Sequence, residues 1–131
     1  MARCAFHGHA PDIEKDLAQL FRRLVFNVLV SNRDDHLRNH GFLRTRSGWR
    51  LAPAYDLNPN LEKQEHALTL DEASAEPRID TVLETAEFYR LNSTEAEAIF
   101  SQVRSAVSGW KTKAHSIGLP RAELQRMESA F

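Results

Sequence analysis

The chain has 131 residues, of which 42% are hydrophobic and 27% charged, and its formal net charge is −1. These values predict one folded domain with its own core, and they exclude a disordered chain or a strongly basic nucleic-acid-binding protein. No apolar run approaches the roughly 20 residues of a membrane helix, so we expect no membrane span. Cys4 is the only cysteine, and the N-terminus lacks a signal-peptide pattern, so we expect a cytoplasmic protein without an internal disulfide.

The N-terminal segment contains Cys4, His7 and His9, which are side chains that can bind a soft metal ion. No fourth ligand lies nearby in the sequence. We therefore interpret residues 1–11 as a loose start rather than as a metal site.

A helix is predicted from Ile13 to Val30 or Ser31, with Asp12 as its N-cap. Apolar residues recur in it at the spacing of three and four that marks one buried helical face. These residues are Ile13, Leu17, Leu20, Phe21, Leu24, Val25 and Val28. Polar residues such as Lys15, Asp16 and Gln19 are assigned to the opposite face.

A polar loop follows this helix, with the sequence SNRDDHLRNH over residues 31–40. It lies between the apolar helix end and the apolar segment Gly41-Phe42-Leu43. Charged groups are costly to bury without partners, so a loop of this kind is more stable facing solvent or a ligand. We interpret it as the chemical centre of the chain.

Two short alternating segments, 42–45 and 49–51, flank a turn with Gly48 and predict a β-hairpin. Asp56 follows in a second compact polar turn, where a turn-capping role and a functional role both remain open. Residues 67–70 predict one further short strand.

The remaining sequence predicts helices. One begins near Asp80, a long one runs from Ser93 or Thr94 to Gly118, and a last one begins at Pro120. Their apolar stripes indicate core packing and carry no catalytic signal. The predicted fold class is therefore mainly α with a small β-hairpin.

Three polar residues stand at a spacing that suits phosphoryl transfer. Asp34 and Asn39 are separated by four residues on the polar loop, and Asp56 stands 17 residues after Asn39, just past the hairpin. Phosphoryl transfer needs one carboxylate at the attacking hydroxyl, and hard oxygen ligands that hold Mg²⁺ against the nucleotide phosphates. Asp34, and not Asp35, gives the spacing Asp-x-x-x-x-Asn, which looks like the catalytic loop of protein kinases.

A more specific resemblance is carried by two stretches, NRDDHLRNHGFL at residues 32–43 and WRLAPAYDL at residues 49–57. Together with ALTL at 67–70, they resemble the HipA family of bacterial toxin kinases. The resemblance implies that residues 1–131 form the helical C-terminal lobe of a Ser/Thr kinase fold, as a single domain without the N-terminal lobe.

The resemblance also implies roles for individual residues. Asp34 would be the catalytic base, Asn39 and Asp56 would hold Mg²⁺ and with it ATP, and His36 would have a supporting role near the phosphates or the substrate hydroxyl. The expected partners are a protein substrate, in known cases an aminoacyl-tRNA synthetase, and an antitoxin. Direct nucleic-acid binding by this chain is not expected.

The sequence lacks parts that a complete kinase needs. None of its five glycines cluster into a phosphate-binding loop, and no N-terminal sheet with an ATP-gripping Lys is present. We therefore expect the chain alone to be inactive or weak, with the N-lobe supplied by a longer protein or by a separate chain. The kinase hypothesis predicts that Asp34, Asn39 and Asp56 converge on one cleft, and that an apolar surface lies near the helix at 13–30.

Two alternatives stay open. The chain could be a non-catalytic protein-interaction module of a toxin–antitoxin pair, which needs no ATP. It could also be a metal-dependent hydrolase with Asp34, Asp35, His36 and Asp56 as ligands.

Overall fold

The computed structural model describes residues 12–60 and 79–131. In chain order, the elements are α2 (Ile13–Leu29), a 3₁₀ turn (Leu37–Asn39), β1 (Phe42–Thr45), β2 (Gly48–Leu51), α3 (Ile79–Glu84), a 3₁₀ helix (Thr85–Tyr89), α4 (Ser93–Ser108), α5 (Trp110–Ser116) and α6 (Arg121–Met127). The prediction of a mainly helical chain with one hairpin is confirmed. The histidines and cysteine at 4–9 and the predicted strand at 67–70 lie outside the described residues.

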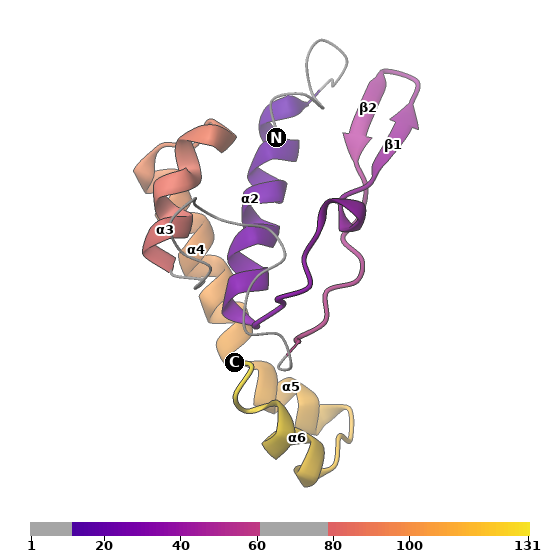
Figure 1. Ribbon diagram of the computed structural model, residues 1–131, viewed down its shortest axis with the longest axis vertical. Coiled ribbons are helices and arrows are strands. Elements are labelled where there is room, and N and C mark those ends of the chain that lie inside the picture. Colours follow the sequence, from indigo (N-terminus) through magenta and orange to yellow (C-terminus); the bar gives the residue numbers. More distant parts are fainter. Residues whose placement is uncertain (1–11, 61–78) are drawn as a thin grey trace.

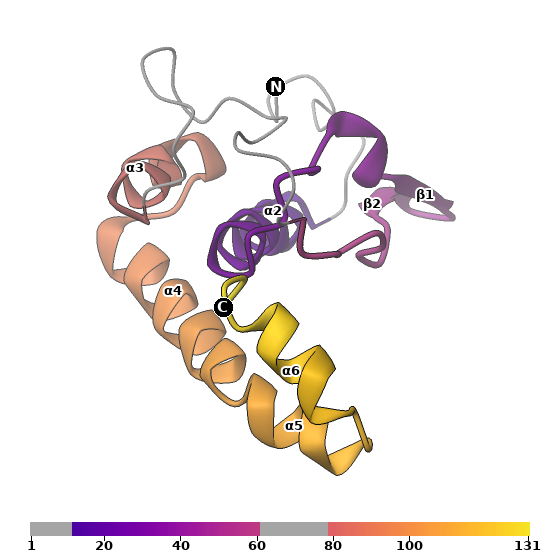
Figure 2. The same ribbon diagram turned by 60° about the horizontal axis from the view of Figure 1, so that its bottom comes forward.

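Helix α2 lies at the centre of the described fold (Figures 1 and 2). Its apolar face buries Phe21, Val25 and Val28, as the three- and four-residue spacing predicted. These side chains pack against Val82 and Ala86, and against the buried residues of α4, which are Ala96, Ile99 and Val103. None of the described helices is long and apolar enough to cross a membrane.

The hairpin packs beside α2 and is anchored to it by a buried carboxylate. Asp16, only 3% exposed, accepts from Arg50 Nε at 3.1 and 3.2 Å and from the backbone N–H of Leu51 at 3.2 Å. The sequence pattern placed Asp16 on the polar face of the helix, and the structure shows that the hairpin buries this residue. Its partners come from a strand more than 30 residues away, and helical periodicity cannot reveal them.

Helix α4 begins at Ser93, one of the two starting residues that the sequence pattern predicted. Its N-cap is Asn92: the Asn92 side chain accepts from Glu95 N at 3.0 Å, and the Glu95 carboxylate accepts from Asn92 N at 2.9 Å. This reciprocal pair is a capping box, which satisfies two backbone donors at the helix start.

Asn92→Ala is expected to lower the free energy of unfolding by about 1 kcal/mol, because it removes the acceptor of the capping box. Urea unfolding followed by circular dichroism measures the change. Ser105→Ala, on the exposed side of the same helix, is the control and should stay within about 0.5 kcal/mol of the unsubstituted protein. A loss as small as the control's would contradict a stabilising cap.

The long helix predicted to end at Gly118 is instead two helices, which corrects that prediction. Helix α4 ends at Ser108, Gly109 adopts φ −83° and ψ 2°, and α5 begins at Trp110. The Ser108 hydroxyl donates to the Ser105 carbonyl at 2.8 Å. Serine and glycine are poor helix-interior residues, and a serine that bonds back to the helix often bends it.

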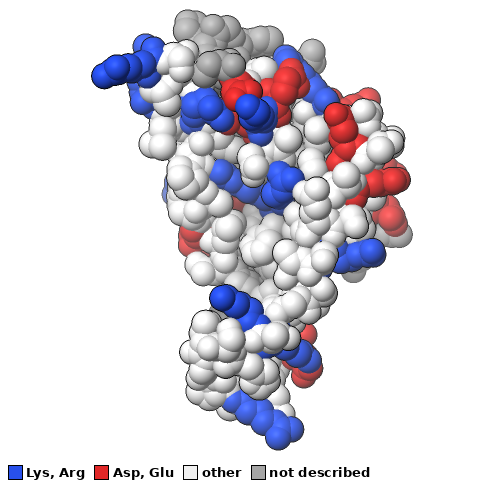
Figure 3. All heavy atoms as spheres, turned by 180° about the vertical axis from the view of Figure 1, so that it is seen from behind, with Lys and Arg blue, Asp and Glu red and all other residues white. Residues whose placement is uncertain are grey.

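Helices α5 and α6 form an antiparallel pair that extends from the end of α4 (Figure 2). Trp110 stacks on Phe131 with ring centroids 4.5 Å apart, and Lys111 forms an ion pair with Glu128. On the face opposite to Figure 1, acidic and basic side chains are interspersed rather than segregated into one basic surface (Figure 3).

Candidate functional site

The polar loop is fixed to the end of α2 by two asparagines. Asn32 donates from its backbone to the Asn27 carbonyl at 2.8 Å and from its side chain to Asn27 Oδ1 at 3.1 Å, and both residues are buried. Ser31 between them has φ +53°, in the left-handed region. The chain therefore leaves the helix in a sharp turn that the two bonds between Asn32 and Asn27 hold in place.

Asn39 lies in a short 3₁₀ turn and its side chain is directed by the loop itself. Its backbone N–H donates to the His36 carbonyl at 2.8 Å, and its side-chain Nδ2 donates to the Asp34 carbonyl at 3.4 Å. This bond orients the amide, whose acceptor atom is the oxygen Oδ1. Asp34 itself is half-buried at the start of this turn.

Asp56 lies on the segment beside this loop. Its carbonyl accepts from Asn32 Nδ2 at 3.5 Å, and two further bonds join the same segments: Asn60 N to the Ser31 carbonyl at 2.9 Å, and Tyr55 Oη to the Arg38 carbonyl at 2.6 Å. The structure thus brings together the segments that carry Asp34, Asn39 and Asp56, although they are distant in sequence.

The backbone of Asp56 is strained, with φ +56°. A residue other than glycine in this region costs of order 1–3 kcal/mol, and such residues cluster at functional sites. Its exposed carboxylate accepts from Asn58 Nδ2 at 3.0 Å, so the local turn supports the conformation. Two of the three described non-glycine residues with positive φ, Ser31 and Asp56, flank this site.

His36 immediately precedes the 3₁₀ turn and is half-buried. Its Nδ1 is buried and has no hydrogen-bond partner among the described residues. The expected supporting role of His36 stays a prediction.

Asp35 does not have the kinase-like spacing to Asn39, but it is one of the most buried charged residues among those described. Its Oδ1 lies 2.9 Å from Nε2 of His40, and Asp35 is 4% exposed. The only sequence signal for this contact is an acid and a histidine five residues apart, on either side of the turn that holds Asn39.

The donor chemistry of the site suits Mg²⁺. An amide oxygen from Asn39 and a carboxylate from Asp56 are hard ligands, and such a pair holds the ion together with nucleotide phosphates rather than as a closed protein cage. Among residues 12–60 and 79–131, no group of three or more His, Cys, Asp or Glu side chains is placed to hold a metal. Asp34, Asp35, His36 and Asp56, the ligands named for the hydrolase alternative, therefore do not form such a group among these residues.

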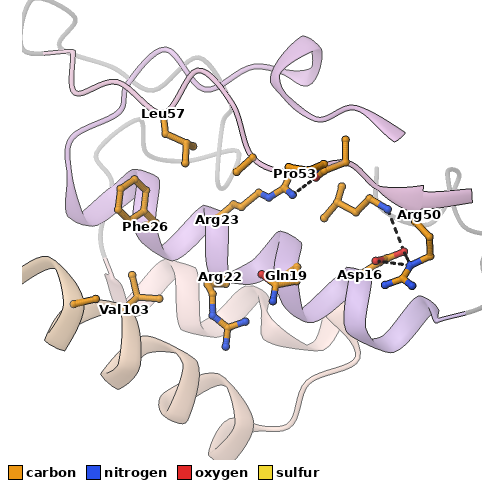
Figure 4. A pocket seen from close by; sticks show the side chains of 13 residues that line it. Asp16, Gln19, Arg22, Arg23, Phe26, Arg50, Pro53, Leu57 and Val103 are labelled. Atoms are coloured by element: carbon orange, nitrogen blue, oxygen red, sulfur yellow. Dashed lines mark hydrogen bonds and ion pairs between the residues drawn. The ribbon is translucent and has the colours of Figure 1, made fainter. Parts of the chain in front are cut away.

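A separate hollow of about 560 Å³ lies between α2, the segment after β2 and α4 (Figure 4). Its lining includes apolar side chains such as Phe26, Leu57 and Val103, and the guanidinium of Arg23. Arg23 donates to the Ala52 carbonyl, and burial lowers its pKa. Asp34, Asn39 and Asp56 do not line this hollow. An apolar surface therefore does lie near α2, as predicted, while the N-lobe as its occupant stays a prediction.

The fold and this loop define a class: a mainly helical domain in which a polar loop follows a buried helix and is joined to the segment after a hairpin. The family model for HipA-like C-terminal domains matches residues 1–110. The chain therefore belongs to the family of HipA-like C-terminal domains, which confirms the resemblance seen in the sequence. No curated protein and no solved structure gives a significant match.

Proposed function

We propose that this domain is the C-terminal lobe of a HipA-like Ser/Thr protein kinase and carries the lower half of its phosphotransfer site. The observation that supports this most is the strained Asp56, held beside the polar loop through the bond from Asn32 to its carbonyl. Strain of this kind is stable only where surrounding contacts impose it.

Each residue has a distinct role in this proposal. The half-buried Asp34 accepts or orients the proton of the attacking hydroxyl of a protein substrate. Asn39, oriented by its bond to the Asp34 carbonyl, and Asp56 offer oxygens to Mg²⁺. The ion, when bound, neutralises charge on the phosphates of ATP. His36 has a supporting role at the edge of the site.

The upper half of the site has to come from elsewhere. Phosphoryl transfer depends on positioning, and these 131 residues have no clustered glycines to hold the phosphates from above. We therefore propose that an N-lobe, in a longer protein or a separate chain, completes the site, that an antitoxin is a second partner, and that the cytoplasm is the compartment. The domain alone is expected to be weak or inactive.

A second candidate function is a non-catalytic interaction module of a toxin–antitoxin pair. The hollow beside α2 favours it, together with the exposed apolar side chains of Leu43 and Trp49 on the hairpin. These features offer contact area to a protein partner without any use of the polar loop.

Calorimetric titration of ATP into the protein, once with Mg²⁺ and once with EDTA, separates the two candidates. The kinase proposal predicts weak binding that requires the metal, because Asn39 and Asp56 contact the nucleotide through it. Binding in neither condition would contradict the kinase proposal and favour the interaction module.

A further inference from the structure

We infer that Asp35 and His40 are positioning residues: their buried contact closes the loop around the 3₁₀ turn and fixes Asp34 and Asn39 relative to each other. This inference rests on the proposed function, since it assigns a purpose to residues that touch neither the substrate nor the metal in that proposal.

The first support is the geometry of the contact. Asp35 and His40 directly follow Asp34 and Asn39, so one link joins the two ends of the candidate loop. Asp35 Oδ1 and His40 Nε2 are 2.9 Å apart, and the side chains are 6% and 15% exposed. Because a carboxylate only accepts, His40 Nε2–H is the donor.

The second support is the ring of bonds that this link completes. Between its two ends, Asn39 N donates to the His36 carbonyl at 2.8 Å, and His40 N donates to the Leu37 carbonyl at 3.2 Å. A three-residue 3₁₀ turn is a weak element by itself. The buried side-chain contact supplies the additional restraint that keeps Asn39 Nδ2 on the Asp34 carbonyl.

The third support is the difference in burial between Asp35 and its neighbour. Asp35 is 4% exposed, and its charge acts on two groups outside the loop: it opposes the lowering of the pKa of Arg23 on α2, and, after burial of the Tyr89 hydroxyl, it is the second cause that raises the pKa of Tyr89. Asp34, one residue earlier, is half-buried. Of the two adjacent carboxylates, Asp35 is therefore the buried one that pairs with His40, and Asp34 is the more accessible one.

The test compares Asp35→Ala with Asp35→Asn. Asparagine keeps an oxygen that accepts from His40 Nε2–H, whereas alanine does not. We expect Asp35→Ala to weaken the Mg²⁺ affinity of the protein–ATP complex by about 10- to 100-fold, as for other residues that orient metal ligands, and Asp35→Asn to restore most of the loss. Glu97→Ala, an exposed acid on α4, is the matched control and should leave the affinity unchanged.

Hydrogen exchange of the Asn39 and His40 amides gives a readout that does not depend on ATP. Both amides should exchange faster in Asp35→Ala than in Asp35→Asn. If Asp35→Ala fails to fold, His40→Ala and His40→Gln replace the pair, because glutamine retains a side-chain N–H donor.

The possible outcomes distinguish a failure of the positioning role of Asp35 and His40 from a failure of the proposed function. Unchanged exchange and unchanged Mg²⁺ affinity in the alanine variants overturn the link. Faster exchange with unchanged Mg²⁺ affinity shows a merely structural contact and overturns the positioning role. Absence of Mg²⁺-dependent ATP binding in the unsubstituted protein overturns the proposed function, and the positioning role with it.

Discussion

Asp56→Asn is expected to abolish Mg²⁺-dependent ATP binding while the fold keeps its stability. The substitution removes the negative charge that would hold the ion. It keeps a side chain of the same shape, and asparagine, like aspartate, tolerates the left-handed region in which residue 56 lies. Titration of ATP in the presence of Mg²⁺, beside urea unfolding of the same variant, measures both effects.

Asp56→Ala is the companion variant that separates charge from backbone strain. Alanine lacks the side-chain oxygen that accepts from Asn58, and it is poorly suited to a positive φ, so this variant should also lose about 1–2 kcal/mol of stability. Mg²⁺-dependent binding that persists in Asp56→Asn would show that this carboxylate is not a ligand and that the strained turn has another cause.

Phe21→Ala is expected to lower the free energy of unfolding by about 3–5 kcal/mol. Phe21 is 0% exposed at the centre of the core, where α2 meets α4 and the 3₁₀ helix, and its ring lies 5.3 Å from that of Tyr89. Alanine would leave a cavity between elements that cannot close together freely. Most domains of this size have 5–15 kcal/mol of stability, so the variant should be close to unfolding.

Phe88→Ala is the matched control for this prediction. The same substitution is made one residue before Tyr89, but the Phe88 side chain is 63% exposed, so the change should stay near 0.5 kcal/mol. Chemical unfolding followed by tryptophan fluorescence measures both variants. Equal losses at the two positions would contradict the core described for α2.

The fold was largely predictable because its main elements follow local patterns. The apolar spacing in α2 and the alternation around Gly48 depend on residues that are neighbours in sequence, and the observed bounds agree with them closely. The end of α4 was not predictable in this way. An apolar stripe continues through Trp110, while the break depends on a weak propensity at Ser108 and Gly109.

For the candidate site, the spacing of Asp34, Asn39 and Asp56 follows from the sequence, and their roles stay predictions. The structure joins the segments that carry them through bonds from Asn32 to the Asp56 carbonyl and from Asn39 to the Asp34 carbonyl. The burial of Asp16 and of Asp35 was missed, because a charged residue in a polar stretch looks solvated until its partner is known. For Asp16 the missing information is tertiary, since Arg50 reaches it from the hairpin. For Asp35 it is local, since the turn between Asp35 and His40 folds back and buries their contact.

The most direct test of the proposed site replaces Mg²⁺ by paramagnetic Mn²⁺ in the presence of ATP and follows backbone amide signals by NMR. We predict that the signals of Asp34, Asn39 and Asp56 broaden together at low Mn²⁺, while those of α6 stay sharp, and that Asp56→Asn removes the effect. Broadening that is centred elsewhere, or that leaves Asn39 and Asp56 unaffected, would contradict a phosphotransfer half-site at this loop.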